Sequence, residues 1–147
     1  MHEKFMREAL RLARETGLGE EVPVGAVVVI DGEIAGRGAN SPIARHDPTA
    51  HAEILAIREA AGRAGNYRLA GATLYCTLEP CPMCAGALVA ARIDRLVFGA
   101  RDLRFGAVRS KFRLADSDLL NHSVEIVEGV LAAECVTLLR EFFEMRR

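Results

Sequence analysis

The sequence predicts one α/β domain in which helices pack on both faces of a sheet of about five strands. Segments with helical and strand-like patterns alternate along the 147 residues, which favours a layered α/β architecture. Hydrophobic residues make up 50% of the chain, enough to form a substantial core. There is no repeat, low-complexity tract or linker, and the length is that of one ordinary domain. We therefore expect residues 1–147 to fold as one unit.

The first half of the chain contains two predicted helices and two predicted strands. An amphipathic pattern predicts a first helix that contains Phe5, Leu10, Leu12 and Ala13 and ends near Gly17. The β-branched run Val22–Ile30 is typical of a buried strand, and the turn Asp31-Gly32 joins it to a return strand at Glu33–Ala39. Thr49 can cap a second helix, which holds His51 and Glu53 in its first turn and ends near Gly62 or Gly65.

The second half continues the alternation. We predict a strand at Ala72–Leu78, followed by a helix that Pro80 starts and Cys81–Ala91 fill, because proline is tolerated in a first helical turn. Two further strands are predicted at Arg95–Phe98 and Val124–Val127. Between them lies an irregular basic segment with a short helical piece at Ser117–Leu120. An amphipathic last helix is predicted at Leu131–Met145.

The net charge of the chain and its hydropathy pattern limit the classes of function that the protein can have. The net charge of −1 excludes a chain that is basic as a whole, so RNA binding would need a local patch. Residues 101–113 hold five basic side chains and one acid, a local charge of +4 that a solvated loop would explain equally well. The start of the chain lacks the apolar region of a secretory signal, and the run Ala26–Ile30 is too short to span a bilayer. We expect a cytoplasmic protein with no membrane segment.

The central motif is His51-Ala52-Glu53 followed by Pro80-Cys81-Pro82-Met83-Cys84. Four cysteines in a cytoplasmic chain indicate metal binding or catalysis before disulfides. Cys81 and Cys84 are three residues apart at a helix start, so both sulfurs lie on one face, where the helix dipole favours thiolates. With the imidazole of His51 they form a three-ligand zinc site whose fourth position stays open for water, as in catalytic zinc centres.

Glu53 is the expected proton carrier of this site. It lies two residues after His51, too close to be a comfortable second ligand on the same helix, but within reach of a water molecule on the metal. Hydrolytic removal of an amine needs a carboxylate that takes a proton from water and hands it to the leaving nitrogen. The order H-x-E…P-C-x-x-C is the described signature of zinc nucleobase deaminases, so the interpretation here matches a known pattern.

The remaining cysteines and histidines are interpreted mainly as structural. Cys76 falls in a predicted strand and Cys135 in the last helix, so both are expected in the core. His46 is placed in a loop beside the pocket and His122 in a surface loop. All four remain candidates for a fourth zinc ligand, which would make the site structural.

Beyond the zinc motif, the sequence resembles the bacterial tRNA adenosine deaminases over nearly its whole length. The resemblance covers the segments Val22–Ala26, His46–Glu53, Asn66–Leu69, Ala72–Tyr75, Thr77–Cys81, Phe98–Asp102 and Phe142–Arg147. It implies a cytidine deaminase-like three-layer α/β/α fold with a mixed five-stranded sheet, one zinc per subunit and a homodimer. It also implies hydrolytic deamination of the wobble adenosine to inosine in the anticodon loop of an arginine tRNA with an ACG anticodon.

The same resemblance implies roles for individual residues. Asn40 would contact the edge of the flipped base, the backbone at Ala52 would read it near the exchanged amine, and Asp102 would touch the neighbouring nucleotide. Phe143 and Arg146 would lie near the RNA. Separately, the basic stretch suggests an RNA-backbone patch made of Arg104, Arg109, Lys111 and Arg113.

Two features depart from the family pattern. Phe105 and Arg109 stand where small or polar residues and glycine are expected, and the chain ends at Arg147 without a basic tail. One rival function is therefore a deaminase of a free nucleobase or nucleoside such as guanine or cytosine, which would close its pocket instead of leaving an open basic groove. A second rival, a zinc-binding module without catalysis, would have no need of Glu53.

Overall fold

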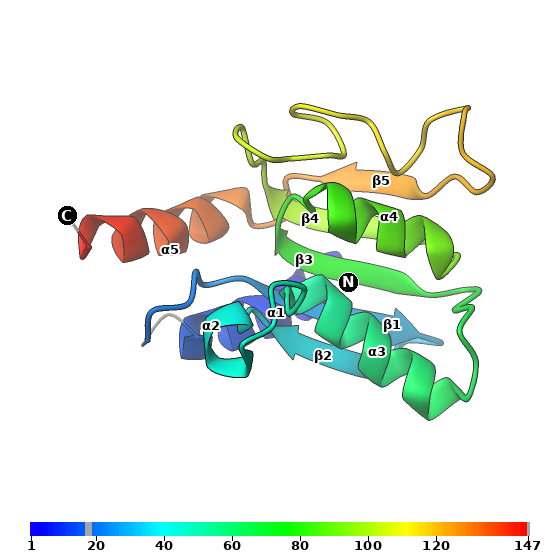
Figure 1. The fold of residues 1–147 in the computed structure, drawn as a ribbon, viewed down its shortest axis with the longest axis horizontal. Helices are drawn as coiled ribbons and strands as arrows, with labels where there is room; N and C mark the ends of the chain where they lie inside the picture. Colours follow the sequence, from blue (N-terminus) through cyan, green and yellow to red (C-terminus); the bar gives the residue numbers. More distant parts are fainter. Residues whose placement is uncertain (17–18, 147) are drawn as a thin grey trace.

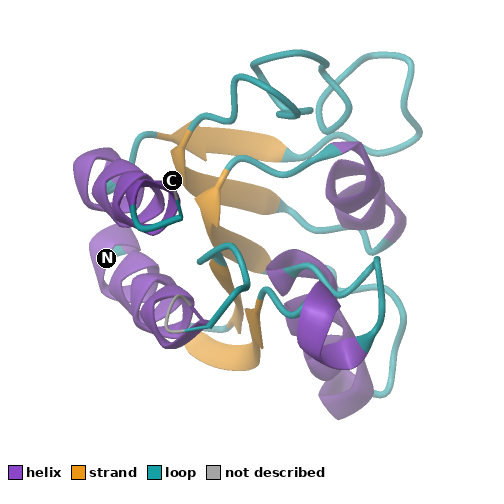
Figure 2. Ribbon diagram, turned by 60° about the vertical axis from the view of Figure 1, so that its left-hand side comes forward, coloured by secondary structure: helices purple, strands orange, loops and turns teal. Residues whose placement is uncertain are grey.

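The computed structural model describes residues 1–16 and 19–146. It contains one five-stranded sheet in the order β2-β1-β3-β4-β5. Helices α1 and α5 cover one face of the sheet, and α2, α3 and α4 lie on the other (Figures 1 and 2). The three-layer α/β/α architecture with a mixed sheet is therefore confirmed.

The elements follow the predicted order, with shifts of a few residues at their ends. The strands are β1 (Gly25–Ile30), β2 (Glu33–Ala39), β3 (Thr73–Leu78), β4 (Arg95–Ala100) and β5 (Glu125–Glu128). The helices are α1 (His2–Thr16), α2 (Pro42–Arg45), α3 (Ala52–Ala64), α4 (Pro82–Ala90) and α5 (Ala132–Glu144). The predicted end of the first helix at Gly17 lies outside the described residues.

Four local predictions are corrected, and one short helix had not been predicted. Residues 22–24 precede β1 instead of belonging to it. The short helix α2 was not predicted, and Ser117–Leu120 forms a turn closed by a bond from Leu120 N to Ser117 O instead of a helical piece. His51 is itself the N-cap of α3, because the Thr49 hydroxyl donates to Asp47. Cys81 is the N-cap of α4, so Pro82 and not Pro80 occupies its first turn.

The strand directions bring the carboxyl ends of several strands to one edge of the sheet. β1 runs antiparallel to both β2 and β3, while β3, β4 and β5 are parallel. The carboxyl ends of β2, β3 and β4 therefore meet at the same edge. The segments that follow β2 and β3 lead from this edge to the first residues of α3 and α4, respectively.

The helix α3 lies unusually close to the sheet because of glycines in β2. A Cβ atom at Gly38 would lie 2.1 Å from the carbonyl oxygen of Ala52, and one at Gly36 would lie 2.2 Å from that of Ala56. Only glycine permits such an approach between backbones. The contact sets the height of α3 above the sheet and with it the position of His51, which immediately precedes this helix.

A long irregular segment connects β4 to β5. Residues 101–124 contain no helix or strand, yet Ala107, Val108, Ala115 and Val124 are buried. Their backbone groups need partners outside regular secondary structure. Among the described helices, none is both long and apolar enough to cross a membrane.

We expect Gly38→Ala to lower the free energy of unfolding by about 1–3 kcal/mol, because the added methyl group forces α3 away from β2. Urea unfolding followed by circular dichroism measures the change. Gly62→Ala is the matched control: this glycine lies in α3 with nothing within 4 Å of an added Cβ, and alanine favours helix. A Gly38→Ala variant as stable as the wild type would contradict the inferred close packing.

Candidate active site

Three metal-binding side chains meet where α3 and α4 begin. The Nδ1 atom of His51 lies 3.5 Å from the Sγ atom of Cys81 and 3.5 Å from that of Cys84. Among the described residues these three form the one group of histidines, cysteines and carboxylates close enough to hold a metal ion, with all ligand atoms within 4.8 Å of one another. The structure thus brings together the three predicted ligands.

The helix termini explain this geometry. His51 and Cys81 are both N-cap residues, and neither uses its side chain to cap its own helix. Cys84 occupies the third helical position of α4, which is the position that lies beside an N-cap side chain. The local spacing therefore pairs the two sulfurs, while the fold supplies the imidazole from the neighbouring helix.

The donor set fits zinc. Zinc prefers cysteine and histidine ligands, and bond lengths of ~2.3 Å to sulfur and ~2.0 Å to nitrogen place the two donor atoms about 3.5 Å apart in a tetrahedral site. The distances from His51 to both sulfurs match that value. Three protein ligands leave one tetrahedral position for a water molecule or substrate, as expected for a catalytic centre.

The two sulfurs and the imidazole shift the pKa values of one another. The hydrogen bond from the Cys84 thiol lowers the pKa of Cys81 to about 4, assisted by His51 and by the backbone N–H of Cys84. The same bond raises the pKa of Cys84, and the contact with Cys81 raises that of His51. The lowered pKa of Cys81 favours its thiolate, which is the form that binds zinc.

Glu53 lines the same cavity as the metal ligands His51 and Cys81. Its side chain is only 4% exposed, and burial raises the pKa of its carboxyl group above the usual value. The cavity has a volume of about 460 Å³, within the range of small-ligand sites. Its lining includes Asn40, His51, Glu53, Cys81, Asp102 and Phe105.

A slightly larger hollow lies elsewhere and has a different character. It measures about 490 Å³ and lies along α5, between Glu134, Phe142 and the facing residues Arg14 and Pro23. None of its lining residues belongs to the metal-binding group. Cavity size alone would therefore point away from the chemistry.

The other cysteines and histidines do not join the metal group. Cys76 is fully buried and Cys135 is 1% exposed, so both belong to the core as predicted. His46 is an exposed residue that ends α2, and the imidazole of His122 bonds to the carbonyl oxygen of Ile93. No fourth protein ligand is therefore found near the site among the described residues.

Three of the predicted substrate contacts lie at or beside the cavity. Asn40 and Asp102 line it, and the Asn40 amide is anchored by a bond from Nδ2 to the carbonyl oxygen of Val22. Ala52 is fully buried and is the first residue of α3, directly between His51 and Glu53. Asn40 and Asp102 thus share a cavity with the metal ligands His51 and Cys81.

The two predicted contacts near the C-terminus do not line the cavity. Phe143 is 48% exposed on α5 and packs edge-on against Phe142, with ring centres 5.1 Å apart. The guanidinium of Arg146 lies 3.6 Å from the centre of the Phe142 ring and donates to the carbonyl oxygens of Phe142 and Gly19. Arg146 thus serves to tie α5 to the segment before β1.

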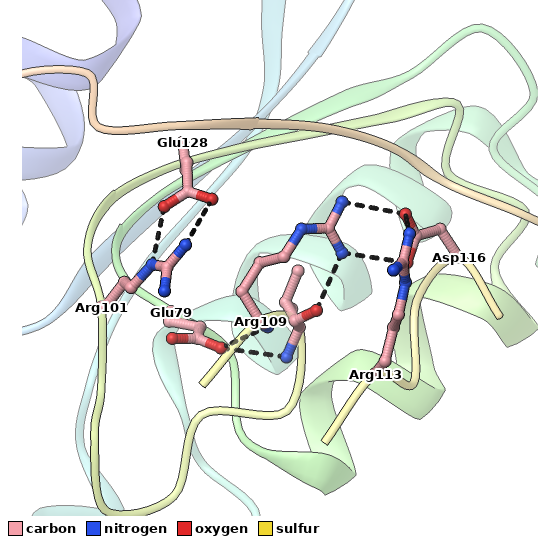
Figure 3. Close-up of polar contacts among 7 residues, drawn as sticks. Glu79, Arg101, Arg109, Arg113, Asp116 and Glu128 are labelled. Carbon is pink, nitrogen blue, oxygen red and sulfur yellow. Dashed lines mark hydrogen bonds and ion pairs between the residues drawn. The ribbon is translucent and has the colours of Figure 1, made fainter. Parts of the chain in front are cut away.

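The basic stretch presents less charge than its sequence suggests. Arg109 and Arg113 both pair with Asp116, and Arg101 pairs with Glu128 through two hydrogen bonds (Figure 3). Both acids lie outside residues 101–113, so a count along that stretch misses them. Arg104 and Lys111 are exposed and form no ion pair among the described residues.

Glu79 is a site residue that the sequence interpretation missed. It is 2% exposed, lines the cavity, and accepts hydrogen bonds from the backbone of Asp102, Val108, Arg109 and Ser110 and from the Ser110 hydroxyl. Burial by itself raises the pKa of this carboxyl, but these bonds outweigh it and hold the pKa below its usual value. One sequence feature could have indicated this role: Glu79 is an acid directly between a buried strand and the Pro-Cys motif.

Comparison with known proteins places this geometry in a family. The family model described as the cytidine and deoxycytidylate deaminase zinc-binding region matches residues 1–100, which include all three metal ligands and Glu53. A tRNA-specific adenosine deaminase of Haemophilus influenzae is 53% identical over 146 residues, covering 99% of this chain and 84% of that protein.

Two solved structures show related folds. One comes from work on A-to-I editing by tRNA:A34 deaminases at the wobble position; it is 44% identical, has a TM-score of 0.89, and the match covers 92% of this chain and 98% of the other. A guanine deaminase from Bacillus subtilis is also 44% identical, but with a TM-score of 0.66 over 69% of this chain and 65% of its own. The chain therefore belongs to the zinc-dependent deaminase family of the cytidine and deoxycytidylate deaminases, and within it to the group of the tRNA-specific adenosine deaminases.

Proposed function

We propose that this enzyme hydrolyses the wobble adenosine of a tRNA anticodon loop to inosine, with an arginine tRNA carrying an ACG anticodon as the substrate. The observation that carries the proposal is a buried carboxylate beside a three-ligand His/Cys/Cys centre in a cavity of base-sized volume. The near full-length similarity to tRNA-specific adenosine deaminases supports RNA over a free base. An anticodon loop suits such a cavity, because flipping a base costs least in single-stranded RNA.

The proposed reaction assigns a task to each residue. Zinc held by His51, Cys81 and Cys84 would supply a water molecule of lowered pKa at the open position. Glu53 would take one proton from the attacking water, whose oxygen bonds to carbon 6 of the adenine, while the second water proton ends on N1 of the inosine. Glu53 then returns the proton to the exocyclic nitrogen, the bond from carbon 6 to nitrogen breaks, and ammonia leaves.

The polar cavity wall would orient the base. Asn40 and Asp102 offer an amide and a carboxylate at positions where the edge of the base and the neighbouring nucleotide would lie. Arg104 and Lys111 would approach RNA phosphates, since neither is engaged by an acid among the described residues. Phe143 and Arg146 would contact more distant parts of the RNA.

Three further expectations belong to this proposal. Residues 1–147 would act as one zinc-dependent deaminase domain, the tRNA substrate would place the reaction in the cytoplasm, and the family resemblance leads us to expect a homodimer. Light scattering coupled to size-exclusion chromatography measures the last of these.

The zinc-loaded protein should form inosine at the wobble position of the ACG arginine tRNA and leave free adenosine, guanine and cytosine unchanged. Sequencing of the treated tRNA and an ammonia assay measure the two results. Release of ammonia from guanine with an unchanged tRNA would instead support the free-base rival, while the zinc chemistry would stand.

Glu53→Gln should bind zinc normally but lose about 10²–10⁴-fold in turnover, because the amide cannot carry the proton. Metal analysis and single-turnover inosine formation measure the two properties. The control is Glu59→Gln, an exposed acid on the same helix. An active Glu53→Gln enzyme would remove Glu53 from the proposed mechanism.

Removal of the metal with a chelator should abolish activity, and added zinc should restore it. Cys84→Ala should fail to retain one zinc per subunit, because the centre then keeps only two protein ligands. Cys135→Ala is the control, since this buried thiol lies outside the metal group. Full zinc content in Cys84→Ala would contradict the ligand assignment.

A further inference from the structure

Residues 102–110 fold around one buried carboxylate instead of forming secondary structure. Glu79 Oε2 accepts the backbone N–H groups of Val108, Arg109 and Ser110 at 3.0, 2.7 and 2.9 Å. Glu79 Oε1 accepts the backbone N–H of Asp102 at 3.1 Å and the hydroxyl of Ser110. Four backbone donors that have no strand or helix partner are thus satisfied by a single side chain.

The segment approaches this carboxylate too closely for any side chain to intervene. A Cβ atom at Gly106 would lie 2.4 Å from the carboxyl carbon of Glu79. The next residue, Ala107, donates its backbone N–H to the carbonyl oxygen of Pro80 at 2.9 Å. The segment is therefore fastened to the two residues that directly precede the metal ligand Cys81.

Two residues of the segment 102–110 form part of the cavity wall. Asp102 and Phe105 line the same cavity as His51 and Glu53, and Phe105 is 61% exposed at its mouth. The carboxylate of Asp102 accepts the backbone N–H groups of Arg104 and Phe105 at 3.0 and 3.1 Å, which shapes the turn between them. Figure 3 shows the second support: Arg109 bonds to Glu79 through its backbone and to Asp116 through its guanidinium.

We propose that Glu79 is a positioning residue that presents Asp102 and Phe105 to the nucleotide beside the reacting base. An exposed aromatic ring at the mouth of a base-sized cavity can stack on a nucleobase, an interaction that tolerates any base but depends on the orientation of the ring. Glu79 fixes that orientation because it holds both ends of the turn that contains Phe105. The inference rests on the proposed RNA substrate.

The test is Glu79→Gln, which keeps the size of the side chain but replaces one acceptor oxygen with a donor facing the backbone N–H groups. We expect KM for the tRNA to rise about tenfold while kcat and zinc content stay near wild-type values. Hydrogen–deuterium exchange followed by mass spectrometry should show faster exchange confined to residues 102–110. A residue needed only for folding would not raise KM at constant kcat and constant zinc.

Three variants accompany this test. Gly106→Ala pushes the segment off the carboxylate from the opposite side and should give the same rise in KM, with the double variant no worse than either single one. Ser110→Ala removes only the hydroxyl bond and should give a smaller rise in a protein that remains folded. Glu125→Gln breaks a surface ion pair with Arg95 at the far end of β4 and should change nothing.

Two outcomes would overturn the proposal. One is faster exchange in residues 102–110 with KM unchanged in Glu79→Gln and Ser110→Ala. The other is unaltered exchange in residues 102–110 of Glu79→Gln, Gly106→Ala and Ser110→Ala. If the wild type leaves tRNA untouched, the proposed function fails by itself, and KM for the substrate that the wild type deaminates decides the role of Glu79.

Discussion

The meeting of two helix N-termini at one sheet edge is the constraint on which the site depends. β2, β3 and β4 all end at this edge, so the chain reaches it once before α3 and again before α4. The glycines of β2 let α3 lie against the sheet, which brings His51 within 3.5 Å of both sulfurs. At both N-caps the helix dipole favours the negative charge that thiolates and carboxylates carry.

Two buried glutamates flank this centre, and their surroundings give them opposite properties. Burial raises the pKa of Glu53, which suits a group that must accept and release a proton. Glu79 receives five hydrogen bonds that outweigh its burial, so it stays ionised and acts as a fixed anchor. In the proposed mechanism, the same residue type would thus carry a proton at one position and hold the backbone of residues 102–110 at the other.

The rim of the cavity combines few free charges with exposed apolar surface. Ion pairs with Asp116 and Glu128 engage three of the five basic residues in the stretch 101–113, and these two acids offset two of its positive charges. Long-range attraction of RNA by this surface is therefore lower than the sequence of the stretch suggests, and the net charge of the chain, −1, adds none. Recognition of a substrate would then depend on the shape of the rim and on contacts such as those of Phe105, which the Glu79 anchor orients.

The sequence by itself placed Cys81 close to Cys84 and Glu53 close to His51, and it determined most of the sheet, because these features depend on local spacing. Cys81 and Cys84 are three residues apart and lie on one face at a helix start, and short apolar runs indicate β1 to β5 without knowledge of their neighbours. Only the tertiary structure decided that His51 meets sulfurs 30 and 33 residues away and that Asp116 neutralises Arg109. It also decided the role of Glu79, whose partners lie 23 to 31 residues along the chain in a segment without periodicity. Such contacts satisfy backbone donors that lie far away along the chain. Because every residue except proline carries a backbone N–H group, the sequence does not show which of these groups a buried carboxylate will bind.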